Sequence, residues 1–162
     1  ILAGHSAGAH TAALLAANPS YLAAQNAGQI QLLALIGLAG PYDLPLEHER
    51  VKEKFSRVQG NEANPIELAH SQMPPTLLIH GESDQIATPR HAERFAEQLQ
   101  NLGVNVELHT YPNRRHVDVL ASLASPLRSW SSAYPDIQRF LERDGRNLNA
   151  VSATPSCESD IK

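Results

Sequence analysis

The chain has little of what marks a disulfide scaffold, a nucleic-acid binder or a membrane-spanning protein. It contains a single cysteine, Cys157, in 162 residues, which excludes an intrachain disulfide framework. Its 13 basic residues are outnumbered by 17 acidic ones, and a net charge of -4 gives no electrostatic case for nucleic acid or an anionic membrane surface. No apolar run reaches the roughly 18 residues of a transmembrane helix. The remaining composition, 42% hydrophobic and 19% charged, suits one globular core.

Motifs for metals and phosphates are missing as well. The eight histidines form no H-E-x-x-H pattern and no Cys/His ligand spacing, so we expect no metal site. The chain also has no G-x-G-x-x-G and no P-loop to hold a phosphate. It begins at Ile1, inside an apolar strand pattern and without an initiator Met. We therefore interpret it as the C-terminal portion of a longer domain.

The stretch Gly4-His5-Ser6-Ala7-Gly8 matches the G-x-S-x-G pattern and leads from an apolar strand end into a helical segment at 9–17. A serine hydroxyl is a weak nucleophile, and it becomes reactive when a sharp turn between strand and helix lifts its oxygen towards a base. Because the helix passes close to the strand in such a turn, we expect both Gly4 and Gly8 to provide clearance. The alternative is a structural glycine-rich turn with an incidental serine.

Strand and helix patterns alternate along the rest of the chain. This order predicts a parallel sheet with helices on its faces. Strands are predicted at 30–38, 76–81 and 104–111, helices at 88–102, 117–123 and from Pro135, and an excursion that lines the substrate pocket at 41–75. We expect residues 1–144 to belong to one domain and residues 145–162, which are polar and lack periodicity, to form a disordered tail.

Three side chains with complementary chemistry each follow a predicted strand: Ser6, Asp84 and His116. The carboxyl ends of parallel strands meet at one edge of a sheet, so these side chains are expected to lie together. A serine hydroxyl needs a neutral imidazole to take its proton, and the imidazole needs a carboxylate on its other nitrogen. The chain order serine, acid, histidine is the order of α/β-hydrolases.

Four segments carry a resemblance to the carboxylesterase-like α/β-hydrolase family, which includes feruloyl-esterase-like and kynurenine-formamidase-like enzymes. They are GHSAGAHTAALLA, GLAGPYDL, HGESDQIATP and YPNRRHVDVL, and the similarity covers about residues 1–143. The resemblance implies an α/β-hydrolase fold with an eight-stranded, mostly parallel sheet, helices on both faces and no cofactor. It also implies hydrolysis of a carboxylic ester or a small amide.

Carried over by position, the resemblance implies that Ser6 is the nucleophile, Asp84 the acid and His116 the base. The backbone N–H of Ala7 would contribute to the oxyanion hole. The family's second oxyanion donor lies in a glycine-rich loop before the elbow, and nothing in this chain corresponds to it. A small-molecule ester is the expected partner. An aryl-formamide substrate, or a catalytically silent binding protein, remains the alternative, and the oligomeric state stays open.

Other residues compete for roles. Asp43 also follows a strand and is an alternative acid, although Pro41-Tyr42-Asp43 fits a turn, so we favour Asp84. Arg114 and Arg115 stand where relatives often carry glycine, and we interpret them as solvated or as favouring an acidic substrate. The remaining polar candidates are expected to be structural or solvated: His5 beneath the elbow, His10 in the core or behind the site, His80 and His109 within strands, and Glu82 in solvent.

Overall fold

Four parallel strands form the centre of the molecule. In the computed structural model, which describes residues 1–45, 53 and 62–151, the strands lie side by side in chain order. They are β1 (Leu2–His5), β2 (Leu35–Leu38), β3 (Thr76–Gly81) and β4 (Val106–Tyr111). Every neighbouring pair is parallel, as the alternation of strand and helix predicts.

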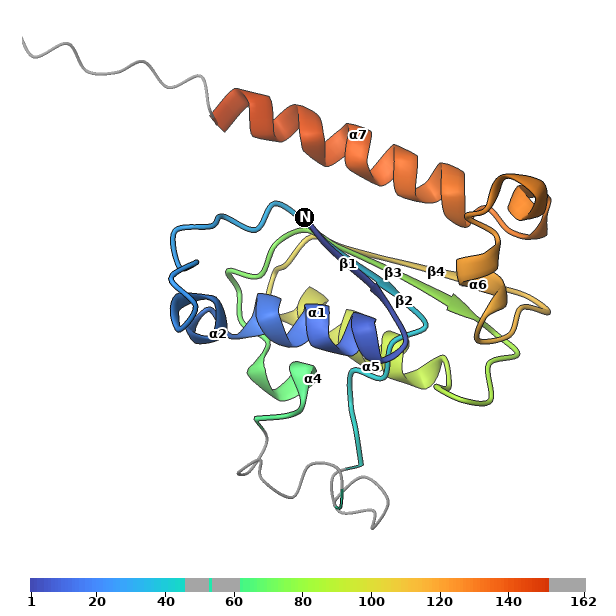
Figure 1. Ribbon diagram of the computed structural model, residues 1–162, viewed down its shortest axis with the longest axis horizontal. Coiled ribbons are helices and arrows are strands. Elements are labelled where there is room, and N and C mark those ends of the chain that lie inside the picture. Colours follow the sequence, from blue (N-terminus) through green and yellow to red (C-terminus); the bar gives the residue numbers. More distant parts are fainter. Residues whose placement is uncertain (46–52, 54–61, 152–162) are drawn as a thin grey trace, which may run out of the picture.

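Helices cover both faces of this sheet (Figure 1). Helices α1 (Ala7–Ala17), α4 (Pro65–Leu68) and α5 (Arg90–Asn101) lie on one face, whereas α6 (Asp118–Ala121) and α7 (Ala133–Val151) lie on the other. The short helix α2 (Ser20–Ala23) follows α1, and a 3₁₀ helix, η1 (Ser125–Trp130), precedes α7. Among the described residues, no helix is long and apolar enough to cross a membrane.

The sheet separates two apolar clusters. Leu78 of β3 packs with alanines of α1 and with Phe95 and Leu99 of α5. Its neighbours in the strand, Leu77 and Ile79, point to the opposite cluster, which contains residues of α6 and α7. All six residues of β3 are buried, because an inner strand of a covered parallel sheet has no solvent face.

The register brings the carboxyl ends of the strands to one edge. His5 at the end of β1 is paired with Leu38 at the end of β2, and Leu38 is paired with Ile79 near the end of β3. The last residues of β3 and β4, Gly81 and Tyr111, are paired with each other. The loops that follow β1, β3 and β4 therefore start at the same edge of the sheet.

Some expected boundaries are wrong. The strand predicted at 30–38 is paired only over Leu35–Leu38, and Ile30 is exposed, because the first residues of that apolar run precede the sheet. Helix α7 continues to Val151, so residues 145–151 are helical and the predicted tail cannot begin at 145. Gly145 weakens a helix by about 1 kcal/mol but removes no backbone hydrogen bond.

Residues 46–52, 54–61 and 152–162, with Cys157, lie outside the described residues.

The two glycines that flank Ser6 are not equivalent. A Cβ atom on Gly4 would lie 2.3 Å from the carbonyl carbon and oxygen of Gly8, so the crossing of β1 and α1 requires glycine at position 4. A Cβ atom on Gly8 would meet nothing within 4 Å among the described residues. The expectation that both provide clearance is therefore wrong for Gly8, whose Cβ direction is open.

We expect Gly4→Ala to destabilise the fold and Gly8→Ala to be tolerated. The first substitution forces the backbone of β1 and α1 apart, at a cost of about 3 kcal/mol or more in the free energy of unfolding. The second replaces a helical glycine by alanine and should stabilise by about 0.5 kcal/mol. Urea unfolding of both variants measures the difference. Equal losses in the two variants would contradict the assigned contact.

Candidate active site

Ser6 occupies the turn between β1 and α1 in a backbone conformation that is rare for a residue with a side chain. Its φ is 55° and its ψ is -122°. Such a conformation costs on the order of 1–3 kcal/mol and persists only where neighbouring structure holds it. The N–H of Ser6 donates to the carbonyl of Leu38 at 2.9 Å, and its own carbonyl accepts from Ala9 at 3.0 Å and from His10 at 3.1 Å. The turn is thus held from the sheet and from the helix.

Ser6, His116 and Asp84 form a continuous chain of hydrogen bonds. His116 Nδ1 lies 2.7 Å from Asp84 Oδ2, and His116 Nε2 lies 2.8 Å from Ser6 Oγ. Because an ionised carboxylate can only accept, Nδ1 carries the proton of a neutral imidazole and Nε2 is free to accept from the serine hydroxyl. The structure thus brings together the three side chains that sequence reasoning selected.

The Asp84 carboxylate is buried and has several hydrogen-bond donors. Oδ1 accepts from the N–H of Ile86 at 2.8 Å and of Ala87 at 3.1 Å, while Oδ2 accepts from His116. Burial raises the pKa of this carboxyl group, but the hydrogen bonds from His116, Ile86 and Ala87 outweigh it, so the pKa of Asp84 lies below its ordinary value. The carboxylate is therefore ionised at neutral pH.

The loops that carry Asp84 and His116 are in direct contact. The N–H of Ser83 donates to the carbonyl of Arg114 at 2.9 Å, and the N–H of Glu82 donates to that of Tyr111 at 3.0 Å. A Cβ atom on Gly81 would lie 2.3 Å from the Arg114 carbonyl oxygen, so glycine is required where the loops meet. Sequence reasoning did not assign this role to Gly81, because nothing local indicates which backbone approaches it.

The alternative acid, Asp43, is engaged elsewhere. It forms an ion pair with Arg94 on α5, whereas Asp84 contacts His116. His10, which sequence reasoning placed in the core or behind the site, is buried, and its Nε2 donates to the carbonyl of Ala63 at 2.7 Å. Burial lowers the pKa of His10 despite that hydrogen bond.

Two further histidines contact residues of the site. His5 Nε2 donates to the carbonyl of His116 at 2.8 Å, and the two rings lie 4.8 Å apart. His80 is fully buried, and its Nε2 lies 3.1 Å from Asp84 Oδ2. His109 contacts Glu107 within β4, and Glu82 is exposed and accepts from Thr110.

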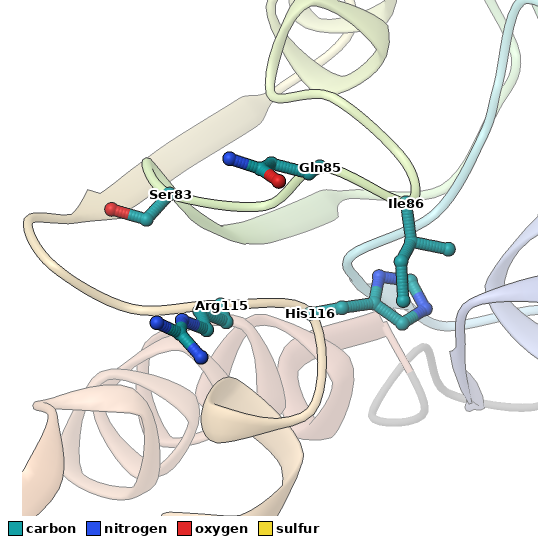
Figure 2. Close-up of a pocket in the computed structure, with 5 residues that line it drawn as sticks. All are labelled: Ser83, Gln85, Ile86, Arg115 and His116. Atoms are coloured by element: carbon teal, nitrogen blue, oxygen red, sulfur yellow. The ribbon is translucent and has the colours of Figure 1, made fainter.

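A pocket of about 330 Å³ opens beside His116 (Figure 2). Ile86 lies next to the imidazole and is 76% exposed, and the side chain of Arg115 lies further along the wall. Ser83 and Gln85 complete the lining. Of the two arginines before His116, Arg115 lines this pocket, while Arg114 contributes its carbonyl to the contact between loops.

Known sequences resemble this chain over most of its length. The profile of the prolyl oligopeptidase family matches residues 1–145. An isoprenylcysteine alpha-carbonyl methylesterase of Arabidopsis thaliana is 31% identical in an alignment 150 positions long, which covers 78% of this chain and 35% of that protein. The esterase LipQ of Mycobacterium tuberculosis is 32% identical in an alignment 143 positions long, which covers 75% of this chain and 33% of that protein. The chain thus spans about a third of these curated relatives.

Solved structures share the fold. A butyrate-bound esterase of Thermogutta terrifontis superposes with a TM-score of 0.71 at 21% identity, covering 88% of this chain and 55% of that one. The carboxylesterase Cest-2923 of Lactobacillus plantarum gives a TM-score of 0.71 at 17% identity, covering 88% and 57%. These α/β-hydrolases confirm the predicted fold, and the sequence matches to esterases and to the family model confirm the resemblance to carboxylesterase-like enzymes.

We expect the chain to lose stability as the pH falls below about 6.5. Burial lowers the pKa of both His10 and His80, so the unfolded chain, whose imidazoles have a pKa of about 6.5, binds protons first. The contribution of these two histidines to the free energy of unfolding is complete above that pH and is lost as the pH falls towards their pKa values in the folded chain. The lowered pKa of Asp84 extends the loss to more acidic pH.

Urea unfolding at about pH 7.5 and about pH 5 measures this dependence. His10→Gln removes one of the titrating imidazoles, so the decrease between the two pH values should be smaller in that variant. A free energy of unfolding that stays constant over this range would contradict the burial of neutral histidines.

Proposed function

The chain belongs to the prolyl oligopeptidase family, and on that premise we propose that it hydrolyses carboxylic esters through a serine acyl-enzyme. The observation that carries the proposal is the hydrogen-bond chain from Ser6 through His116 to Asp84. The two curated relatives are both named as esterases, which supports an ester over other acyl substrates. The lowered pKa of Asp84, which leaves its carboxylate ionised beside His116, also supports the proposal.

In the first half-reaction, His116 Nε2 takes the proton of Ser6 as Oγ attacks the ester carbonyl. Asp84 stabilises the resulting imidazolium through Nδ1–H. The tetrahedral intermediate collapses as the C–O bond to the alcohol breaks, and His116 returns the proton to the departing oxygen. Water then attacks the acyl-enzyme with His116 again as base, and the acid is released from Ser6.

We assign to the backbone N–H of Ala7 the role of donating a hydrogen bond to the oxyanion of the tetrahedral intermediate. Ala7 is the first residue of α1, so its N–H has no acceptor inside the helix. The helix start also carries a partial positive charge that favours a nearby anion. Ala7 is exposed and directly follows Ser6, so a substrate bound at Ser6 would lie next to this residue.

We expect Ser6→Ala to abolish hydrolysis of p-nitrophenyl acetate, with a fall in kcat on the order of 10⁴-fold or more, because no other group supplies the nucleophile. A fluorophosphonate probe should add one label to the wild-type chain, on Ser6, as measured by mass spectrometry of peptides. Ser20→Ala, at an exposed helix start far along the chain from the site, should be labelled like the wild type.

A folded wild-type chain that hydrolyses no ester should next be tested with aryl-formamides. Turnover of these, with loss in Ser6→Ala, would replace the ester by an amide and keep the serine mechanism. The absence of both activities and of the label would contradict the enzyme proposal and favour a binding protein.

We expect Asp84→Asn to lower kcat by roughly 10³- to 10⁴-fold, because an amide nitrogen can donate where the imidazole needs an acceptor and so favours the wrong tautomer. Asp43→Asn is the matched control. Its carboxylate pairs with Arg94 in a partly solvated position, so kcat should stay within about threefold of wild type. Comparable losses in both variants would remove the assignment of Asp84 as the acid.

A further inference from the structure

His80 shares an acceptor with His116. Its Nε2 lies 3.1 Å from Asp84 Oδ2, the same oxygen that His116 Nδ1 approaches to 2.7 Å. It also lies 2.6 Å from the carbonyl oxygen of Ala87. His80 is the penultimate residue of β3 and is completely buried, so this contact is made by a side chain that substrate and solvent do not reach.

The surroundings determine the tautomer of His80. A carbonyl oxygen can only accept, so Nε2 must carry the proton that it shares between Ala87 and Asp84. Nδ1 is then unprotonated, and among the described residues it has no hydrogen-bond partner. A second proton there would place an unsatisfied charge in a buried site, which is costly. His80 is therefore a neutral donor in a fixed orientation.

We propose that His80 is a positioning residue that acts on His116 through the Asp84 carboxylate. This inference rests on the proposed serine mechanism. Without His80, Oδ2 would keep one donor, the His116 imidazole, and no second group would fix the position of that oxygen. With His80, Oδ2 is held between two imidazoles, while the backbone N–H groups of Ile86 and Ala87 hold Oδ1.

The effect on proton transfer follows from charge. The groups that face His80 are Asp84 from its own loop, His116 from the loop after β4 and His91 from α5. Burial lowers the pKa of His80 and of His91, so both imidazoles are neutral at neutral pH. His80 is thus a neutral donor whose hydrogen bond partly offsets the negative charge on Oδ2. Without His80, the carboxylate would stabilise the protonated form of His116 more strongly.

The test compares His80→Leu, which has no donor, with His80→Gln, whose amide nitrogen can reach the same acceptors. We expect His80→Leu to lower kcat/KM roughly tenfold to a hundredfold through a misplaced imidazole. The acid limb of its kcat/KM profile should move to higher pH by roughly 0.5 unit or more, because His116 is then harder to deprotonate. His80→Gln should restore both towards wild type.

A second readout does not depend on turnover. The proton between His116 Nδ1 and Asp84 should give a far-downfield NMR resonance, which should shift or disappear in His80→Leu and return in His80→Gln. His10→Leu is the matched control, because it removes another buried imidazole that donates to a carbonyl. We expect His10→Leu to be less stable than the wild type, but its NMR resonance and the pH of its acid limb should be unchanged.

The proposal would be overturned if His80→Leu left both the NMR resonance and the acid limb of the kcat/KM profile unchanged. It would also be overturned if His80→Leu and His80→Gln shifted these two readouts equally. Should His80→Leu not fold, His80→Asn, whose shorter amide ends near the position of Nδ1, replaces it in both comparisons. If the wild-type chain hydrolyses no ester, the proposed function fails, and the resonance alone then decides whether His80 positions His116.

Discussion

The geometry of the candidate site depends on one buried carboxylate. A negative charge that is removed from water must find hydrogen-bond donors for its lone pairs, or it is neutralised by a shift in pKa. Asp84 has four: two amide N–H groups of its own loop and two imidazole N–H groups. These bonds order the loop after β3 and bind it to His116. The hydrogen bonds from His116, Ile86 and Ala87 keep the carboxylate ionised, and the bond between Oδ2 and Nδ1 holds the His116 imidazole in one orientation.

The parallel sheet makes this arrangement possible. Loops from β1, β3 and β4 begin at one edge because all the strands run in the same direction and are paired nearly to their ends. Backbone contacts then align the loops, with the Arg114 carbonyl packed against Gly81 and the N–H of Ser6 bonded to Leu38. The reacting groups are thus placed by strand ends and short loops, which position them more accurately than long flexible segments would.

The loop after β2 meets different constraints, which explains why its acid does not join the site. Tyr42 is completely buried and stacks on Phe95 of α5 with ring centroids 4.8 Å apart. A Cβ atom on Gly37 would lie 1.9 Å from the Tyr42 hydroxyl, so the ring occupies space that only glycine leaves open. The buried ring directs the chain towards α5, where Asp43 meets Arg94. Packing of one aromatic residue therefore separates two carboxylates that both follow strands.

The sequence by itself determined the kinds of elements and their order, because apolar periodicity and glycine positions act locally. It indicated the elbow at Ser6, the parallel sheet and the three residues that share its carboxyl edge. Only the tertiary structure decided which glycine meets a backbone, since Gly4 and Gly8 look alike in the pattern but only Gly4 faces a neighbour. It also decided that His80, which local pattern marks as a structural strand residue, shares Asp84 with His116. Such contacts join residues far apart in the chain, and no local pattern records which side chains folding brings within hydrogen-bond distance.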